Sequence, residues 1–221
     1  MDKIGLLELI AKINTKDEYF TVSTETASWK ARREAETLTD PSLFPLLQEI
    51  IEEYDGKRKD RREVRYAAYF IFGRLMQASF DKAACAFFLR RLGEETDKYV
   101  LSSMLDRISD WQRLAGKTVP AGSDTSNILR LIKDDRRPVR HSAIRALCAC
   151  PGEESRDVLR CYLLQEDEKA FQYEIYYANI AMQSIGRPED IPLLEPFLKS
   201  RRPDIKMTAQ YAIRYIRERE E

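Results

Sequence analysis

Histidine and cysteine are the residues best suited to metal binding or nucleophilic catalysis, and this chain has few of them. Its 221 residues include one histidine, His141, and four cysteines, Cys85, Cys148, Cys150 and Cys161. The cysteines lack CxxC spacing, and Cys148 and Cys150 lie two apart in a helical pattern, so they point in different directions. We therefore expect no metal and no cofactor, and interpret the cysteines as small buried hydrophobic residues.

Sequence motifs of common catalytic sites are absent. The chain has no glycine-rich phosphate loop, no HExxH and no GxSxG motif, and it lacks a second histidine that would activate a nucleophile. Carboxylates are abundant, but the sequence does not show any two facing each other. This pattern favours a protein that is not an enzyme.

Pairs of arginines precede three predicted helices, and they suit either of two roles. A phosphate backbone or an acidic peptide could bind along such a row of cations. The turns that begin at Gly93 and Gln165 are acidic, however, so neighbouring turns alternate in sign, and we favour salt bridges between them. The possible anion-binding residues are Arg61, Arg62, Arg136, Arg137, Arg201 and Arg202, and the expected acidic partners of the last four are Glu94, Glu95, Glu166 and Glu168.

Aromatic residues among the cations could stack nucleic-acid bases, but their positions favour packing. Most of the 11 tyrosines fall on helices predicted to form the outer layer of the fold. Trp29 and Trp111 are interpreted in the same way. Trp111 precedes residues 115–123, part of the longest predicted connection within a helical hairpin, and long loops on a rigid scaffold often carry function.

The elements that would position these residues are internal repeats. Four predicted helices place alanine at Ala68, Ala143, Ala178 and Ala209, with Ile71, Ala146, Ala181 and Ala212 three residues later. These columns form one helical stripe of small residues, which allows close packing of a neighbouring helix. Arg65, Arg140 and Lys206 share the second position of that stripe, where we expect them to brace the turns.

Each repeated unit continues with a second apolar helix, so the unit is a helical hairpin. Glycines lie between the helices, and prolines stand at helix starts. Pro196 is an exception inside a second helix, where we expect a kink. The predicted units begin near Thr24, Lys57, Glu94, Asp134, Gln165 and Ser200.

Both ends of the chain are expected to cap one domain that spans residues 1–221. Residues 1–14 form an amphipathic helix that suits either a membrane surface or a cap over the first repeat, and we favour the cap. Residues 200–221 form a closing helix.

The segments "DDRRPVRHSAIRALCACP" and "GRPEDIPLLEPFLKS" resemble the two halves of a HEAT repeat, particularly the short bacterial type of phycobilisome lyases. The resemblance implies an all-α, right-handed α-solenoid of about five to six hairpins, with second helices along a concave face. It does not imply a function, because such repeats serve many binding tasks and a few enzymes.

Charge favours a protein partner over nucleic acid. Lys plus Arg and Asp plus Glu are both 37, and the charges on the predicted second helices sum to a negative value. We therefore expect a protein or peptide partner on the concave face, such as a toxin that this chain neutralises. The candidate contacts are Glu49, Glu53, Arg90, Arg91, Arg130, Arg160 and Glu195.

Two enzyme classes remain as alternatives. A HEAT-like glycosylase that repairs alkylated DNA would need a basic groove, and a bilin lyase is suggested by analogy alone. The chain has no apolar run of the roughly 20 residues that a membrane span needs, so we expect a soluble, cytoplasmic protein without a membrane span.

Overall fold

A computed structural model describes residues 1–17 and 22–219. The described residues form helices joined by turns, without a β-strand. The α-helices are α1 (Lys3–Ile13), α2 (Ala27–Glu36), α3 (Leu43–Glu53), α4 (Lys59–Ala78), α5 (Lys82–Glu94), α6 (Lys98–Ala115), α7 (Ser126–Leu131), α8 (Arg137–Ala146), α9 (Glu153–Leu163), α10 (Gln172–Ile185), α11 (Ile191–Leu194) and α12 (Pro203–Glu218). The 3-10 helices are η1 (Ser23–Glu25), η2 (Leu147–Ala149), η3 (Pro188–Asp190) and η4 (Glu195–Lys199).

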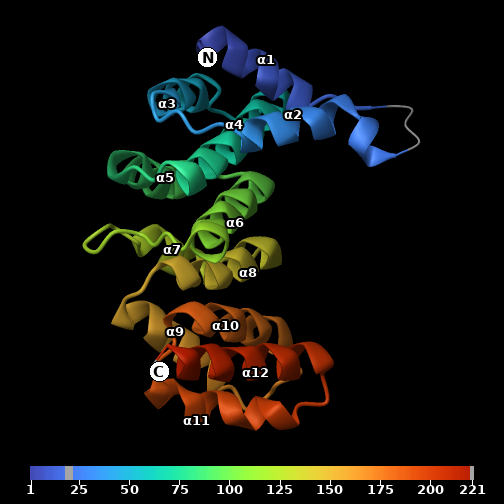
Figure 1. Ribbon diagram of the computed structural model, residues 1–221. Coiled ribbons are helices and arrows are strands. Elements are labelled where there is room, and N and C mark those ends of the chain that lie inside the picture. Colours follow the sequence, from blue (N-terminus) through green and yellow to red (C-terminus); the bar gives the residue numbers. More distant parts are fainter. Residues whose placement is uncertain (18–21, 220–221) are drawn as a thin grey trace.

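The helices stack as hairpins in two layers (Figure 1). The hairpins are α2–α3, α4–α5, α6–α7, α8–α9 and α10–α11, and α12 follows as a single helix. In the first layer α4 packs on α6, α6 on α8, α8 on α10, and α10 on α12. In the second layer α5 contacts α7, and α9 contacts α11. The predicted all-α solenoid is confirmed, and each predicted unit start lies a few residues before the first helix of a unit.

The small-residue stripe lies where the first helices meet. Ala68, Ala143, Ala178 and Ala209 are all fully buried. Gly73 also allows close packing of a neighbouring helix, because a Cβ atom there would lie 2.5 Å from Cγ of Arg107 on α6. Trp111 of α6, also fully buried, donates a 3.2 Å hydrogen bond from Nε1 to the Gly73 carbonyl. Small residues therefore set how closely successive units approach.

The ends of the stack carry α1 and α12 (Figure 1). α1 buries Leu6, Leu9, Ile10 and Ile13 and packs against α2, α3 and α4. The assignment of residues 1–221 to one domain with these helices as caps stays a prediction. No helix in the described ranges is both long and apolar enough to cross a membrane.

The second helix of the last hairpin is interrupted at the predicted position. Its α-helical part has four residues, and the chain continues as the 3-10 helix η4 from Glu195, with Pro196 at its second position. Proline lacks the N–H group that the next α-helical hydrogen bond needs, so the tighter 3-10 turn replaces it.

Candidate binding face

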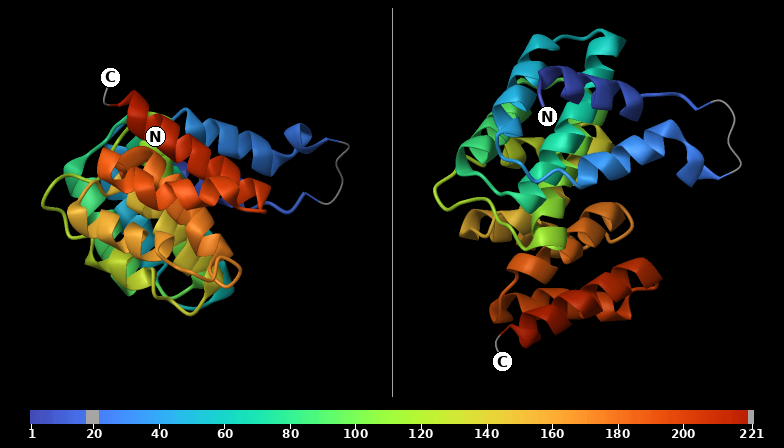
Figure 2. Two further views of the ribbon diagram at one scale, coloured as in Figure 1. Left: turned by 90° about the horizontal axis from the view of Figure 1, so that it is seen from below. Right: turned by 45° about the horizontal axis from the view of Figure 1, so that its top comes forward.

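Among the described hairpins, the third has the longest connection between its two helices. Its second helix, α7, has six residues, whereas α5 has 13 and α9 has 11. Residues 116–125 connect α6 to α7 and project from one side of the stack in Figures 1 and 2. The short helix and the long loop together leave hollows between the second helices.

Backbone hydrogen bonds anchor this loop at defined points. Gly116, with φ of 64°, ends α6 in the left-handed conformation, and the N–H of Val119 donates to the Ala149 carbonyl at 2.8 Å. Gly122 has φ of 80°, a conformation that glycine adopts without strain. The loop is therefore held against the turn that precedes α9.

Side chains of α7 tie it to α5, one unit earlier. The Asn127 amide donates to the Leu89 carbonyl at 3.3 Å, and Nη2 of Arg130 lies 3.5 Å from the Leu92 carbonyl. A Cβ atom at Gly93 would lie 2.8 Å from Oδ1 of Asn127, so α5 and α7 meet closely there.

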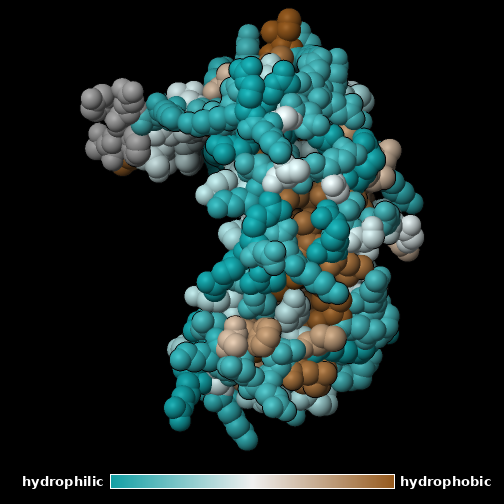
Figure 3. All heavy atoms as spheres, turned by 180° about the vertical axis from the view of Figure 1, so that it is seen from behind, coloured by the Kyte–Doolittle hydropathy of each residue, from teal (hydrophilic) through white to brown (hydrophobic). Residues whose placement is uncertain are grey.

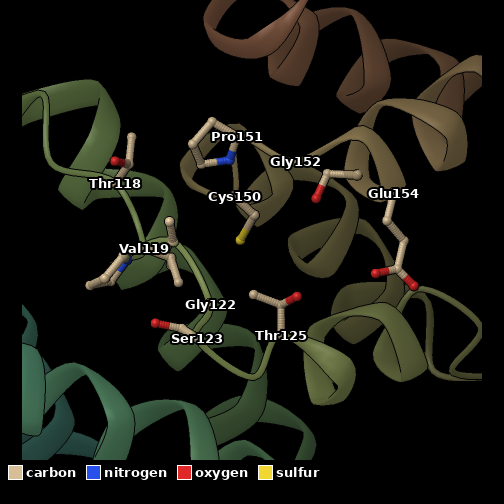
Figure 4. Close-up of a pocket in the computed structure, with 12 residues that line it drawn as sticks. Thr118, Val119, Gly122, Ser123, Thr125, Cys150, Pro151, Gly152 and Glu154 are labelled. Carbon is tan, nitrogen blue, oxygen red and sulfur yellow. The ribbon is translucent and has the colours of Figure 1, made fainter.

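Two cavities flank the loop. The cavity on the α9 side is about 420 Å³ and lies between residues 118–125 and 150–155. Figure 4 shows the Cys150 sulfur pointing into it, with Val119 and Thr125 on the loop side and Glu154 at the edge. The cavity on the α5 side is about 580 Å³ and is lined by Lys82, Ala86, Leu89 and Arg90 of α5, residues 120–124 of the loop, and Asn127. A third hollow, lined by Arg130, Lys133 and residues 134–136, lies at the other end of α7.

Several charged residues predicted to bind a partner have partners within the chain. Nζ of Lys3 on α1 lies 2.8 Å from Glu49 and 2.5 Å from Glu53. Hydrogen bonds to the two glutamates raise the pKa of Lys3 above its ordinary value. Both carboxylates thus join α1 to α3.

The adjacent predicted residues Arg90 and Arg91 differ in exposure. Arg90 is exposed and pairs with Glu94 at 2.8 Å and Glu52 at 3.4 Å. Arg91 is buried, with a hydrogen bond of 3.3 Å from Nε to the Tyr69 hydroxyl and an ion pair to Glu94. Only Arg90 of the two is accessible to a partner.

The remaining predicted contacts lie apart from one another. Arg130 is exposed on α7, and Glu195 is exposed at the start of η4. Arg160 of α9 reaches the next hairpin, where Nε donates to the buried Asp190 carboxylate at 2.6 Å. This hydrogen bond is the main reason that the pKa of Arg160 lies above its usual range.

The arginines at the start of three first helices pair locally with aspartate. In each pair the arginine and the aspartate lie two positions apart in the sequence. The nitrogen–oxygen distances are 2.8 Å for Arg58–Asp60, 2.7 Å for Arg136–Asp134 and 2.9 Å for Arg202–Asp204. A partner on the same turn is reached without ordering a distant segment. This pairing offsets the unfavourable position of a cation at a helix N-terminus.

The other predicted anion-binding arginines differ in what their side chains contact. Nη1 of Arg61 donates to the Glu53 and Asp55 carbonyls, and Arg62 lies 3.5 Å from Asp97. Arg137 is exposed, with its guanidinium 4.9 Å from the centre of the Tyr173 ring, and Arg201 is exposed.

Salt bridges between units exist, as the pair of Arg62 with Asp97 shows, but the glutamates predicted as partners of the later arginines were wrong. In the described part of the chain, Arg136, Arg137, Arg201 and Arg202 form no ion pair with Glu94, Glu95, Glu166 or Glu168. Arg65 instead pairs with Glu95, and Arg140 pairs with Glu174 at 3.0 Å. Each also donates to carbonyls of the turn before its helix: Arg65 to Tyr54 and Gly56, Arg140 to Asp134 and Asp135. These two arginines brace the turns as predicted, whereas Lys206 is exposed.

His141 is partly buried, and three of the cysteines are buried. His141 lies 3.3 Å from Glu174 and 5.5 Å, centre to centre, from the Tyr173 ring. Cys85, Cys148 and Cys150 are buried, as predicted, whereas Cys161 is exposed. Within the described residues no group of three or more His, Cys, Asp or Glu side chains is arranged to hold a metal ion.

The surface seen from behind is mostly hydrophilic, with hydrophobic atoms gathered in a broken band along the middle and lower part of the stack (Figure 3).

The sequence predicted the long loop beside the cavities but not the cavities.

Comparison with known proteins supports a HEAT-like repeat protein. The family model described as HEAT repeats matches residues 126–214, and no curated protein matches the chain. Among solved structures, a designed armadillo repeat protein is 15% identical, with 96% of this chain and 99% of that chain covered and a TM-score of 0.50. At that identity the likeness shows the fold alone: a helical repeat solenoid.

Proposed function

We propose that this chain is a non-enzymatic scaffold that binds a protein or peptide partner on its second-helix face, over α5, α7 and the start of α9. The observation that carries the proposal is the pair of cavities on either side of residues 118–124. Binding sites are typically concave, with apolar walls and a few polar groups.

Accessible charges around α7 support a polar partner surface. Lys82 and Arg90 on α5 and Arg130 and Lys133 on or just after α7 are exposed. Rim charges of this kind direct association and orientation more than they contribute affinity. The structure-based binding set therefore keeps Arg90 and Arg130 from the sequence prediction and adds Lys82 and Lys133.

Site-specific photo-crosslinking tests the proposal. A photoreactive amino acid is placed at Ala86 or Ala121, both exposed on this face, and at Met207 on α12 as a control, which is 47% exposed. In cells of the native host, we expect one discrete protein adduct from the first two positions and none from Met207. Equal adducts from all three positions would contradict the proposed face. Release of a modified base from alkylated DNA, or attachment of a bilin, by the purified chain would contradict a non-enzymatic role.

A further inference from the structure

Three arginines from successive first helices surround one phenylalanine. The guanidinium carbons of Arg32 on α2, Arg74 on α4 and Arg107 on α6 lie 5.2, 5.5 and 5.6 Å from the centre of the Phe70 ring. In Figure 1, α2 lies beside α4, and α6 follows below it. Attraction to one aromatic ring thus holds three cations close together, although cations repel one another. We call these four residues the arginine cluster.

The arginine cluster lies on the side of α4 that is turned away from α5. Phe72, two residues after Phe70, stacks on Phe87 of α5 with the ring centres 5.9 Å apart. Residues two apart on an α-helix point in nearly opposite directions, so Phe70 faces away from the second helices. This surface is therefore separate from the second-helix face.

The carboxylates around the arginine cluster do not balance its charge. Glu36 pairs with Arg33 and with Arg74, at nitrogen–oxygen distances of 2.6 and 2.8 Å, so one carboxylate serves two guanidiniums. Arg32 is partly buried and forms no ion pair and no hydrogen bond within the described part of the chain. On the α2 side, three arginines therefore face one carboxylate.

On the α6 side the charges balance, but the guanidiniums are crowded. Arg107 lies 3.2 Å from Asp110, and Asp106 forms an ion pair with Arg145 of α8. Burial lowers the pKa of Arg107 below its ordinary value, and Arg74 acts to lower it further, whereas Asp110 and Asp106 act to raise it. The whole region thus keeps two uncompensated positive charges.

Three side-chain N–H donors at the arginine cluster lack an acceptor. Nε of Arg74, Nε of Arg107 and Nε2 of Gln77 are buried and have no hydrogen-bond partner among the described residues. Gln77 belongs to the same region, because its Oε1 accepts from Nη1 of Arg74 at 3.2 Å. Buried donors without a partner cost free energy, so the region favours a ligand that brings several acceptor oxygens.

A phosphate monoester matches these groups. It carries a charge of about −1.5 to −2 near pH 7 and offers three acceptor oxygens, whereas a carboxylate would neutralise only one of the two charges. Guanidiniums bind phosphate oxygens in pairs. The side chains of Arg74 and Arg107 are 22% and 18% exposed, so a ligand reaches them from solvent, and their charges are screened less than charges on the open surface.

We propose that Arg32, Arg74 and Arg107 form a binding site for one phosphate monoester group on the first-helix layer. The site goes beyond the proposed function, because it lies on a different face of the stack. The same chemistry belongs to a small phosphorylated compound and to a phosphorylated side chain of a protein.

Calorimetric titration of the full chain tests the site with inorganic phosphate and with a short phosphoserine peptide flanked by alanines. We expect the chain to bind phosphate groups, and to bind neither acetate nor the unmodified peptide at equal ionic strength. Tighter binding of the phosphopeptide than of inorganic phosphate would assign the site to a modified protein. The reverse order would assign it to a small phosphorylated compound.

Arg32→Gln should weaken phosphate binding about tenfold, with little change in melting temperature. Glu36→Gln should strengthen binding, because it removes a carboxylate that competes with the ligand for Arg74. Arg113→Gln is the matched control, since it removes the same charge at an exposed residue of α6 outside the arginine cluster, and it should leave binding unchanged. Thermal unfolding of each variant checks that it is folded.

Three results would overturn the inference: no binding of phosphate or phosphopeptide at millimolar concentration, equal weakening by Arg32→Gln and Arg113→Gln, or equally tight binding of the unmodified peptide. Weaker binding by a folded Glu36→Gln variant would also contradict it. Crosslinks from Ala86 and Ala121 report on the second-helix face, so failure of the phosphate site would leave the proposed function standing.

Discussion

The buried guanidinium of Arg65 on α4 donates to both carboxylate oxygens of Glu95, at 2.8 and 3.1 Å, in the turn that begins the next unit. The two side chains are 2% and 1% exposed. Oε1 of Glu95 also accepts from the backbone N–H groups of Thr96 and Asp97, and the other end of the guanidinium holds the Tyr54 and Gly56 carbonyls. This one pair thus joins three consecutive segments of the repeat.

Removal of one partner is expected to be costly, because it leaves the other charge buried and unpaired. Glu95→Ala should lower the free energy of unfolding by about 3–5 kcal/mol, measured by denaturant unfolding. Arg90→Ala is the control, since the exposed pairs of Arg90 contribute at most about 1 kcal/mol. Equal losses of unfolding free energy in the two variants would show that the buried pair stabilises the packing of the units no more than an exposed pair does.

Two helical glycines should respond to alanine in opposite directions. Gly73→Ala places a Cβ atom within 2.7 Å of Cβ of Arg107 and should destabilise the fold by about 1–3 kcal/mol through overpacking. Gly5→Ala meets only the flexible, exposed Met1 side chain and the Asp2 carboxylate, and should stabilise α1 by up to about 1 kcal/mol. Thermal unfolding of both variants checks the signs. A neutral Gly73→Ala would mean that α4 and α6 do not approach as closely as described.

Labelling with a thiol reagent should distinguish the exposed Cys161 from the three buried cysteines. Burial raises the pKa of Cys85 to about 12 and that of Cys148 to about 11, and it holds the pKa of Cys150 above its usual range. Cys161 is exposed. Because the thiolate is the reactive form, a thiol reagent near neutral pH should add one label to the folded chain and four after denaturation. Rapid addition of a second label under native conditions would contradict this burial.

Mild acid should weaken folding through His141, the only histidine in the chain. Burial lowers the pKa of His141 below its ordinary value of 6.5, although Glu174 acts to raise it and Arg140 and Arg137 act to lower it further. The unfolded chain therefore binds a proton first as pH falls, so stability falls from about pH 6.5 down to the folded pKa.

The slope of stability against pH between about pH 5.5 and 7.5 is the measurement, because few other side chains titrate there. His141→Phe keeps an aromatic ring beside Tyr173 and should flatten that slope. Glu174 titrates at more acidic pH. Burial acts to raise its pKa, but hydrogen bonds from the backbone and Arg140 lower it below 4.5. An unchanged slope in His141→Phe would show that His141 is not the responsible group.

The arginines at the inter-repeat turns should bind polyanions weakly. Arg136 and Arg202 already pair with Asp134 and Asp204. We expect feeble binding of duplex DNA or heparin at physiological salt, and a loss of a few tenths to about 1 kcal/mol of stability for alanine at each paired arginine.

Arg137→Ala and Arg201→Ala, at exposed positions without such an aspartate pair, are the comparison variants. Sub-micromolar binding that falls steeply with salt, and that is lost in the variant with all four arginines replaced, would support anion capture instead.

The sequence by itself determined the helices, their pairing into hairpins and the buried stripe of small residues. Ala68, Ala143 and Ala178 recur at positions that only close helix packing requires, and Pro196 cannot continue an α-helix. These properties follow from local spacing, which a sequence displays directly.

The tertiary structure decided which charges meet and where space remains. Arg65 pairs with Glu95 and Arg140 with Glu174, each in the next unit, because the choice of such ion pairs depends on the rotation and separation of neighbouring units. The cavities beside residues 118–124 likewise depend on how the short α7 sits between α5 and α9. Such relations join residues some 30 to 40 positions apart, and no periodic pattern encodes the empty volume between side chains.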